Sequence, residues 1–506
     1  MVRFIVDPTV PKQQVICSGK KFAPDGGIKI RYGNRVVSCT VHNQTAPGAK
    51  GRTVDTGAAP TAKGRTAADT RAAAVVKGRT VDTGADTRAD TRATSEKDVQ
   101  MRISSQLQKT LRLPAAGRLH CTQANGMWRL GPCLGVYVTK EKNPQRMFGE
   151  QTRLLEDLTR YAEERGVDIV VLTPGFKDRK RGWRFDTGLG TWHETLVTLP
   201  DVVLRRSGTF HEADAKVTAD LNAFQKAGRL HSLPRNSSNK WTFYRVMQQS
   251  STLRPYVPAT VLVTSAAELK TALQRMRDAY LKPINGAQGV CIHRMQLRTG
   301  GVILMSREER VVPRAAERLS TRFRPDTRLV TSELRGDTDL QSFWLSIQDK
   351  FRKWVLQESV QLLHTTDDRP VDFRWLVQYA DGPQVLGRVA RVGSPGAITT
   401  NLHTGGKAMD AKEVLELIPD IDAKQTIADM DTLALGVVEQ LRHAFGPFAE
   451  VGIDIGIDES GKVVAFEVNP TPGRRMLRSL SDNVRKLSLV TLVEYAIRAA
   501  GFENGK

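Results

Sequence analysis

The stretch 450–474, EVGIDIGIDESGKVVAFEVNPTPGR, constrains the fold of this chain more than any other. Residues 451–458 alternate between branched apolar side chains and glycine or aspartate, the period of two that is typical of a strand. Residues 458–461 (DESG) have the composition of a tight turn. Pro470 and Pro472 end the returning strand, because proline cannot donate a hydrogen bond to a ladder. The pattern predicts a β-hairpin.

The register of this hairpin decides which polar side chains share a face. A loop made of the four turn residues pairs Asp454 with Ala465. Glu467 is then the diagonal neighbour of Asp454 on the same face, and Asn469 follows two residues later. Phe466 is expected on the opposite face of the returning strand.

The predicted face carries an all-oxygen set of possible metal ligands. Asp454, Glu467 and Asn469 offer two carboxylates and an amide oxygen, the ligands that Mg²⁺ prefers. Gly452 and Gly456 flank the aspartate and leave room for a bulky anionic ligand. The alternative that these residues leave open is an ordinary exposed hairpin with solvated acids.

The same stretch resembles the metal-binding end of an ATP-grasp fold. Its sequence, GIDIGID followed by EVNPTPGR, is similar to that of the YheC/YheD branch of the superfamily, which is associated with the endospore coat. The resemblance implies that Asp454, Glu467 and Asn469 hold two Mg²⁺ ions against the phosphates of ATP.

Composition and charge narrow the class of protein and its partners. With 506 residues, 40% hydrophobic and 25% charged, the chain is expected to form about two to four globular domains. It has no apolar run long enough to span a membrane and no signal-peptide stretch, so we expect a cytoplasmic protein without a membrane partner. The net charge of +21 favours anionic partners such as nucleotides. Because the charges are spread along the chain without a recognised module, nucleic-acid binding is not expected as the main role. Five scattered cysteines predict reduced thiols and no zinc site.

The N-terminal part is expected to be a small β module that is interrupted by a repeat segment. Residues 1–45 and 99–130 form the module, and residues 46–98 contain two copies of KGRTVDTGA and three of ADTRA. The segment has almost no large apolar residues, so it cannot bury enough surface to offset its ordering entropy. We therefore predict a disordered low-complexity insertion, with a flexible tether or interaction arm as the functional alternative.

Residues 131–235 have the pattern of a small doubly wound α/β domain, similar to the domain that precedes the catalytic core in ATP-grasp ligases. Its expected elements are strands at 134–140, 167–174 and 195–208 and a helix at 148–166. The resemblance assigns the remainder, residues 236–506, to the ATP-grasp domain.

A second set of residues is suited to phosphate binding. Lys282 ends a short strand and is followed by a loop with Gly286 and Gly289. Glycines let backbone N–H groups approach phosphate oxygens, and a lysine adds a point charge. The resemblance implies that Lys282 contacts the α-phosphate and that Lys240, in the first turn of a helix, reaches the phosphates too. A plain turn and solvated lysines are the alternatives.

Residues 353–360 (KWVLQESV) read as a strand. The resemblance makes this strand the hinge between two ATP-grasp lobes, where the backbone around Gln357 meets the adenine edge and Glu358 lies nearby. Composition alone indicates an ordinary buried strand.

The third set lies in 370–406, which resembles the DIR…NLHxGG pattern of amino-acid and peptide ligases in this superfamily. The match implies that Arg374, Arg391 and Asn401 face the γ-phosphate and the acyl-phosphate site, where arginines stabilise moving charge. His403 is favoured as a structural residue over a base. Arg474 could hold a substrate carboxylate, and an exposed arginine is an equal alternative.

Together these patterns predict an α/β (α+β) chain in which an ATP-grasp fold follows a small doubly wound domain and a β module. The implied activity is an ADP-forming ligation that uses ATP, Mg²⁺ and an unidentified carboxylate and amine. The alternative is an ATP-binding structural protein of the spore coat, with other coat proteins as partners.

Overall fold

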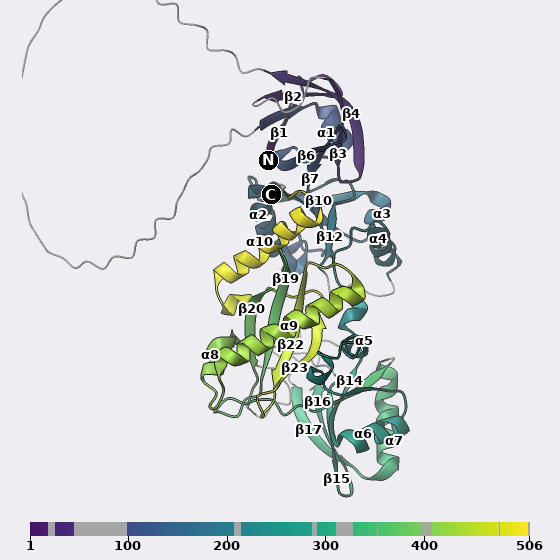
Figure 1. Ribbon diagram of the computed structural model, residues 1–506. Coiled ribbons are helices and arrows are strands. Elements are labelled where there is room, and N and C mark those ends of the chain that lie inside the picture. The colour runs from purple at the N-terminus through teal and green to yellow at the C-terminus, as the bar shows by residue number, and fades with distance from the viewer. Residues whose placement is uncertain are drawn as a thin grey trace, which may run out of the picture.

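A computed structural model describes residues 1–18, 26–44, 99–206, 214–285, 291–309, 327–351, 353–395, 400, 406–474 and 476–503. Four sheets follow one another along an elongated molecule, and the two chain ends lie close together near the N-terminal sheet (Figure 1). Helices and strands are mixed throughout, which confirms the predicted fold class. The predicted insertion at 46–98 lies outside the described residues.

The N-terminal module is a closed barrel with the strand order β1-β5-β2-β4-β3-β7-β6. Its strands are β1 (Val2–Val6), β2 (Gln14–Ser18), β3 (Gly26–Tyr32), β4 (Arg35–Gln44), β5 (Val99–Ile103), β6 (Ala116–Ala124) and β7 (Met127–Gly131), with one helix, α1 (Ser105–Leu111). Strands β4 and β5, which flank the repeat segment, both belong to this barrel, so the segment interrupts a single closed sheet.

The second sheet is the predicted small α/β layer, with the order β11-β10-β9-β8-β12. Its elements are β8 (Cys133–Tyr137), α2 (Thr152–Glu164), β9 (Asp168–Leu172), α3 (Phe176–Arg179), β10 (Arg181–Asp186), β11 (Thr191–Leu196), β12 (Val202–Arg205) and α4 (Ala215–Lys226). Strands β9, β8 and β12 are parallel, as expected for buried apolar runs. The single strand predicted at 195–208 is wrong. The stretch is divided between the end of β11 and β12, with Pro200 between them.

The third and fourth sheets form the two lobes of the C-terminal half. The third has the order β13-β18-β14-β15-β16-β17, and its helices α6 and α7 share its apolar core. Its elements are β13 (Thr260–Val263), α6 (Ala266–Met276), β14 (Asp278–Pro283), β15 (His293–Arg298), β16 (Gly301–Glu309), β17 (Thr327–Leu334), α7 (Gly336–Ile347) and β18 (Trp354–Glu358). The short helices η3 (Arg235–Ser238) and α5 (Lys240–Met247) lie before it in the chain.

The fourth sheet has the order β21-β20-β19-β22-β23 and carries the predicted hairpin. Its elements are β19 (Val371–Tyr379), β20 (Pro383–Val392), β21 (Lys407–Asp410), α8 (Ala411–Glu416), α9 (Ala423–Phe445), β22 (Glu450–Ile457), β23 (Val463–Asn469) and α10 (Asp482–Ala499). Helix α9 packs across β19, β20, β22 and β23 (Figure 1). Helix α10 contacts β19 and β20 and also α2 and β8, so it joins this lobe to the α/β layer.

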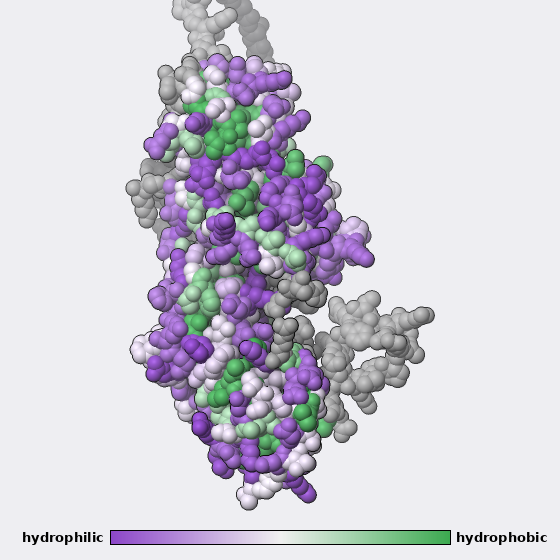
Figure 2. Space-filling model, turned by 90° about the vertical axis from the view of Figure 1, so that its right-hand side faces the viewer, coloured by the Kyte–Doolittle hydropathy of each residue, from purple (hydrophilic) through white to green (hydrophobic). Residues whose placement is uncertain are grey.

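The surface in Figure 2 is largely hydrophilic, and apolar residues form small separate patches on it, as is normal for scattered exposed apolar side chains. None of the helices in the described part of the chain is long and apolar enough to cross a membrane.

Candidate active site

The predicted hairpin is formed by β22 and β23, and its face follows from the alternation in the sequence. Val451, Ile453 and Ile455 are fully buried in the core that includes α9. The intervening residues, among them Gly452 and Asp454, therefore lie on the opposite face of the sheet.

The predicted register is wrong by two residues at Asp454, because the turn is one residue longer than predicted, with Ile457 opposite Val463, and because the hairpin contains a β-bulge. Ile455 pairs with Ala465, but the next residue, Asp454, pairs with Glu467. Phe466 is the extra residue of the bulge, so two residues of β23 oppose one of β22. The bulge places Glu467 directly opposite Asp454 instead of diagonal to it, and Asn469 opposite Gly452.

The two glycines of β22 differ in their surroundings. A Cβ atom on Gly456 would lie 2.5 Å from Phe466 Cε2 and 2.7 Å from Leu362 Cδ2. Phe466 therefore lies on the face that carries Asp454, contrary to the prediction, and Gly456 makes room for packing instead of for a ligand. A Cβ atom on Gly452 would make only ordinary contacts, at 3.4 Å or more.

Four charged side chains form a continuous network beside the hairpin. Arg374 lies opposite Asp454 across β19 and β22, and its Nε and Nη2 atoms each donate to that carboxylate at 2.6 Å. Arg391 donates to both oxygens of Asp372 at 2.7 and 2.6 Å and to Asp454 Oδ2 at 3.0 Å. The network therefore alternates in charge across three strands and connects two of the predicted catalytic arginines with a predicted metal ligand.

Burial and neighbouring charges shift the pKa values of the two carboxyl groups, Asp454 and Asp372, in opposite directions. Burial alone would raise the pKa of Asp454, but Arg374 and Arg391 outweigh it and lower the pKa to about 2. Burial raises the pKa of Asp372 above its ordinary value, and Arg391 offsets only part of this effect. Asp372 was not singled out in the sequence, although its place two residues before Arg374 on an alternating strand puts both on one face.

Lys240 joins the two lobes. Its backbone N–H donates to the Ile284 carbonyl at 3.1 Å, and its buried side chain places Nζ 3.1 Å from Glu467 Oε2. The Asn239 side chain caps α5 by accepting from Thr242 N at 3.1 Å, which fixes where the helix begins. The sequence prediction that Lys240 lies in a first helical turn is thus confirmed, and the side chain is not solvated.

Lys282 lies next to this ion pair. It is half-buried on β14, and its Nζ donates to Gln357 Oε1 at 2.8 Å, while Gln357 in turn donates to Thr260 at 3.1 Å. Burial, together with the nearby Lys240 ammonium, lowers the pKa of Lys282 to about 8, and Glu467 acts in the opposite direction.

A cleft of roughly 430 Å³ lies where the hinge strand meets the hairpin. The exposed Glu358 contributes to its lining together with residues 359–361, and the hairpin contributes residues 458–460 and Val464. Gln357 points instead toward Lys282 and Thr260. The hinge strand therefore places Glu358 beside the cleft and Gln357 beside the lysines.

Three predicted site residues, Gly286, Gly289 and Asn401, lie outside the described residues, and so does His403.

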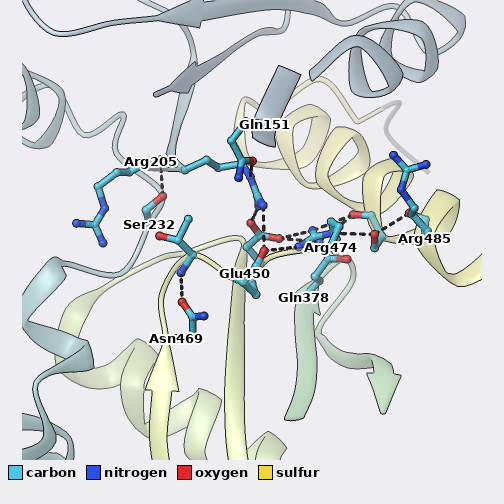
Figure 3. A network of polar contacts seen from close by, with 12 residues as sticks. Gln151, Arg205, Ser232, Gln378, Glu450, Asn469, Arg474 and Arg485 are labelled. Carbon is cyan, nitrogen blue, oxygen red and sulfur yellow. Dashed lines mark hydrogen bonds and ion pairs between the residues drawn. The ribbon is translucent and has the colours of Figure 1, made fainter. Parts of the chain in front are cut away.

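The structure places Arg474 in a buried polar cluster (Figure 3). Its Nε donates to Ser488 Oγ at 2.9 Å and its Nη1 to the Pro472 carbonyl at 3.0 Å, and Nη2 pairs with Glu450. Glu450 also pairs with Arg206, whose Nη2 reaches the same Pro472 carbonyl at 3.0 Å. The exposed-arginine alternative is wrong, and the contacts of Arg474 are structural. Sequence reasoning missed Glu450 and Arg206, because no local pattern signals a contact between residues 244 positions apart.

The donor set of the hairpin is compatible with a cation. Three of the four acceptor positions of Asp454 are taken by guanidinium N–H groups, so one position at Oδ1 remains. Glu467 is partly exposed, and Asn469 accepts from Thr471 N at 3.0 Å through its amide oxygen. Within the described residues, no group of three or more His, Cys, Asp or Glu side chains could hold a metal ion alone. An ion here would therefore need oxygens from a bound ligand or water, which is usual for Mg²⁺.

Several known proteins are similar to this chain. The chain is 23% identical over 347 residues to the endospore coat-associated protein YheC of Bacillus subtilis (strain 168), covering 65% of this chain and 87% of that protein. It is 24% identical over 390 residues to YheD of the same organism, covering 74% of this chain and 79% of that protein. Among solved structures, D-cycloserine synthetase DcsG matches 72% of this chain and 99% of its own, at 13% identity and a TM-score of 0.42. The ATP-grasp ligase PsnB complexed with minimal precursor, Mg, and ADP matches 72% and 97%, at 14% identity and a TM-score of 0.40.

The family model described as YheC/D-like ATP-grasp matches residues 232–498, which is more than half of the 506 residues. This range contains both lobes and every residue of the lysine and arginine clusters described above. The chain therefore belongs to the YheC/D-like ATP-grasp family.

Proposed function

We propose that this protein is an ADP-forming ligase that joins a carboxylate to an amine with ATP and Mg²⁺. The observation that supports it most is the meeting of Lys240, Lys282 and Glu467 where the two lobes face each other. Two lysines beside one carboxylate suit a site that receives phosphates and their cation together.

In this proposal the lysines and the hinge bind ATP. Lys240 and Lys282 contact its phosphates, with Gly286 and Gly289 offering backbone N–H groups. Adenine enters the cleft beside Glu358, and Gln357 holds Lys282 in place. The lowered pKa of Lys282 fits this role, because an added polyphosphate would favour its charged form.

Glu467, Asn469 and the remaining acceptor position of Asp454 would hold Mg²⁺, in one or two ions. The bound metal would neutralise phosphate charge during transfer to the substrate carboxylate. The hairpin bulge supports this assignment, since it sets the two carboxylates directly opposite each other.

Arg374 and Arg391, with Asn401, would stabilise the charge that moves from the γ-phosphate to the acyl-phosphate. Both arginines are already oriented by Asp372 and Asp454, so their guanidinium planes need little reorganisation. An amine then displaces phosphate from the acyl-phosphate and forms the amide.

A second candidate is a non-catalytic ATP-binding protein that is associated with the spore coat. It is favoured by the names of the two Bacillus relatives and by the engagement of Asp454 with two arginines. The protein would then bind Mg-ATP without turning it over.

The test compares the products formed from a small-molecule cell extract, ATP and Mg²⁺ by wild type, Glu467→Ala and Glu416→Ala. Glu416 is an exposed residue of α8, so its variant is a matched control. The ligase predicts a new amide together with ADP in wild type and in the control, and neither product in Glu467→Ala. ADP with a phosphorylated product but no amide would indicate a kinase, and nucleotide binding without any turnover would favour the structural role.

A further inference from the structure

Strand β12 ends at Arg205, which is 7% exposed, and the next residue, Arg206, is 1% exposed. Arg206 is fully engaged: it pairs with Glu450 and donates to the Pro472 carbonyl at 3.0 Å. Arg205 differs. Its Nη2 donates to the Leu233 carbonyl at 3.2 Å, its buried Nε has no hydrogen-bond partner, and no carboxylate of the described residues pairs with it. Among the described residues, Arg205 is therefore a buried guanidinium without a counter-charge.

A buried unpaired charge is costly, so such a group is normally paired or neutralised. Burial lowers the pKa of Arg205 to about 10, and the nearby Arg235 adds to this effect. The guanidinium nevertheless remains charged at neutral pH. Its position thus provides a cation and an unused N–H donor in one place.

The contacts of Arg205 connect it to the proposed active site. Leu233, whose carbonyl it contacts, begins a short segment that ends at Lys240, the partner of Glu467. Helix η3 lies within this segment and packs against β23. Figure 3 shows the backbone of Arg205 beside Ser232, to which its N–H donates at 2.8 Å, while its side chain points away from the Glu450 cluster.

The place in the fold also fits a ligand contact. Arg205 lies at the carboxyl end of β12, and β12 pairs in parallel with β8, which pairs in parallel with β9. In open α/β sheets, ligands bind outside the carboxyl ends of parallel strands. Here that edge lies at the boundary with the lobe that carries the hairpin, because Arg206 bonds to Glu450 across it.

We propose that Arg205 recognises a non-reacting anionic group, a carboxylate or a phosphate, on one of the two substrates. This assignment of the ligand as a substrate rests on the proposed ligase function, whereas the anion site itself does not. A guanidinium presents N–H groups in a planar fork that matches both kinds of anion. The substrate would then span the distance between this end of β12 and the lysine pair.

The test uses the full chain and two probes, inorganic phosphate and succinate, titrated calorimetrically at constant ionic strength. Saturating Mg-AMPPNP occupies the nucleotide phosphate site, and the preceding titration of the nucleotide tests the proposed function separately. Arg205→Gln is compared with Arg298→Gln, which alters an exposed arginine at the end of β15. We expect wild type and Arg298→Gln to bind at least one probe and Arg205→Gln to bind it on the order of 10- to 100-fold more weakly. The stronger probe distinguishes a phosphate from a carboxylate site.

Thermal unfolding in buffer without multivalent anions gives a second readout, which a structural arginine would not produce. Because Arg205→Gln removes an unpaired buried charge, we expect it to unfold at a higher temperature than wild type. Equal anion affinity in wild type and Arg205→Gln, no binding of either probe to wild type, or a variant that is less stable or does not fold would each overturn the proposal. If Mg-AMPPNP fails to bind but anion binding still depends on Arg205, the ligase is refuted and the anion site stands.

Discussion

Arg391 and Arg388 lie on the same strand and make similar bidentate contacts, but they differ in burial. Arg391 has a side chain that is 9% exposed and bridges Asp372 and Asp454, whereas the Arg388 side chain is 36% exposed and pairs with Asp431. Arg391→Gln leaves the buried Asp372 carboxylate without its guanidinium. Removing one partner of a buried ion pair costs about 3–5 kcal/mol, while an exposed pair contributes about 1 kcal/mol or less.

Hydrogen–deuterium exchange of peptides from β19, β20 and β22 measures the stability of this sheet separately from the rest of a multidomain chain. With about 1.4 kcal/mol for each factor of ten, Arg391→Gln should speed exchange that follows the opening equilibrium roughly 100- to 4,000-fold. Arg388→Gln should change it by less than roughly tenfold.

The difference in exchange between Arg391→Gln and Arg388→Gln should depend on pH if its origin is electrostatic. The pKa of Asp372 is raised by burial, and it should rise further without Arg391, so protonation relieves the penalty. The cost of Arg391→Gln should therefore shrink between pH 7 and pH 5, after correction for intrinsic exchange rates. In wild type the lowered pKa of Asp454 contributes stability above pH 4 that is lost as the pH falls toward about 2. Equal effects of the two variants, or a cost for Arg391→Gln that does not change with pH, would refute the argument.

Three further outcomes are expected from the same region. Because the pKa of Lys282 is about 8, Mg-ADP binding measured by calorimetry should weaken as the pH rises above 8. Lys282→Met should remove this pH dependence. An unchanged pH profile in the variant would assign the dependence to another group. Glu467→Gln should reduce the factor by which Mg²⁺ strengthens nucleotide binding, at least about tenfold. Its circular dichroism should stay unchanged, since the side chain is 34% exposed. A loss of folding would contradict a ligand role. Gly456→Ala should destabilise the chain by about 1–3 kcal/mol in urea unfolding, against less than about 1 kcal/mol for Gly452→Ala, because only the first Cβ clashes with the packed, partly buried side chains of Phe466 and Leu362; similar costs would show that the hairpin adapts.

Local patterns predicted the elements of the C-terminal half better than their pairing. The strict alternation in 451–457 identified β22. The bulge at Phe466 was not predictable, since its residues are ordinary for a regular strand and only the packing over Gly456 distinguishes them. One extra residue was enough to change which side chains face Asp454.

Ion pairs between strands and helices that are distant in the sequence explain the rest of the difference between the predicted and the observed site. The alternation placed Asp372 and Arg374 on one face, but which acid each arginine meets depends on the strand order β20-β19-β22. Sequence alone contains no such order. The same applies to Arg474, where the contacts depend on α10 and on the α/β layer packing against the hairpin.

Ion pairs at two glutamates of unequal burial, Glu450 and Glu467, position the hairpin. At one end, Glu450 begins β22, and Arg206 and Arg474 hold both its carboxylate and the Pro472 carbonyl that follows β23. On β23, opposite Asp454, Glu467 pairs with Lys240, and its side chain is 34% exposed against 7% for Glu450. A ligand that brings its own phosphates and cation can compete with the Lys240–Glu467 pair, whose carboxylate is partly exposed, but not with the Glu450 cluster, in which all three side chains are buried. Nucleotide binding should therefore rearrange Lys240 and Glu467 while the Glu450 cluster keeps the hairpin fixed to the α/β layer.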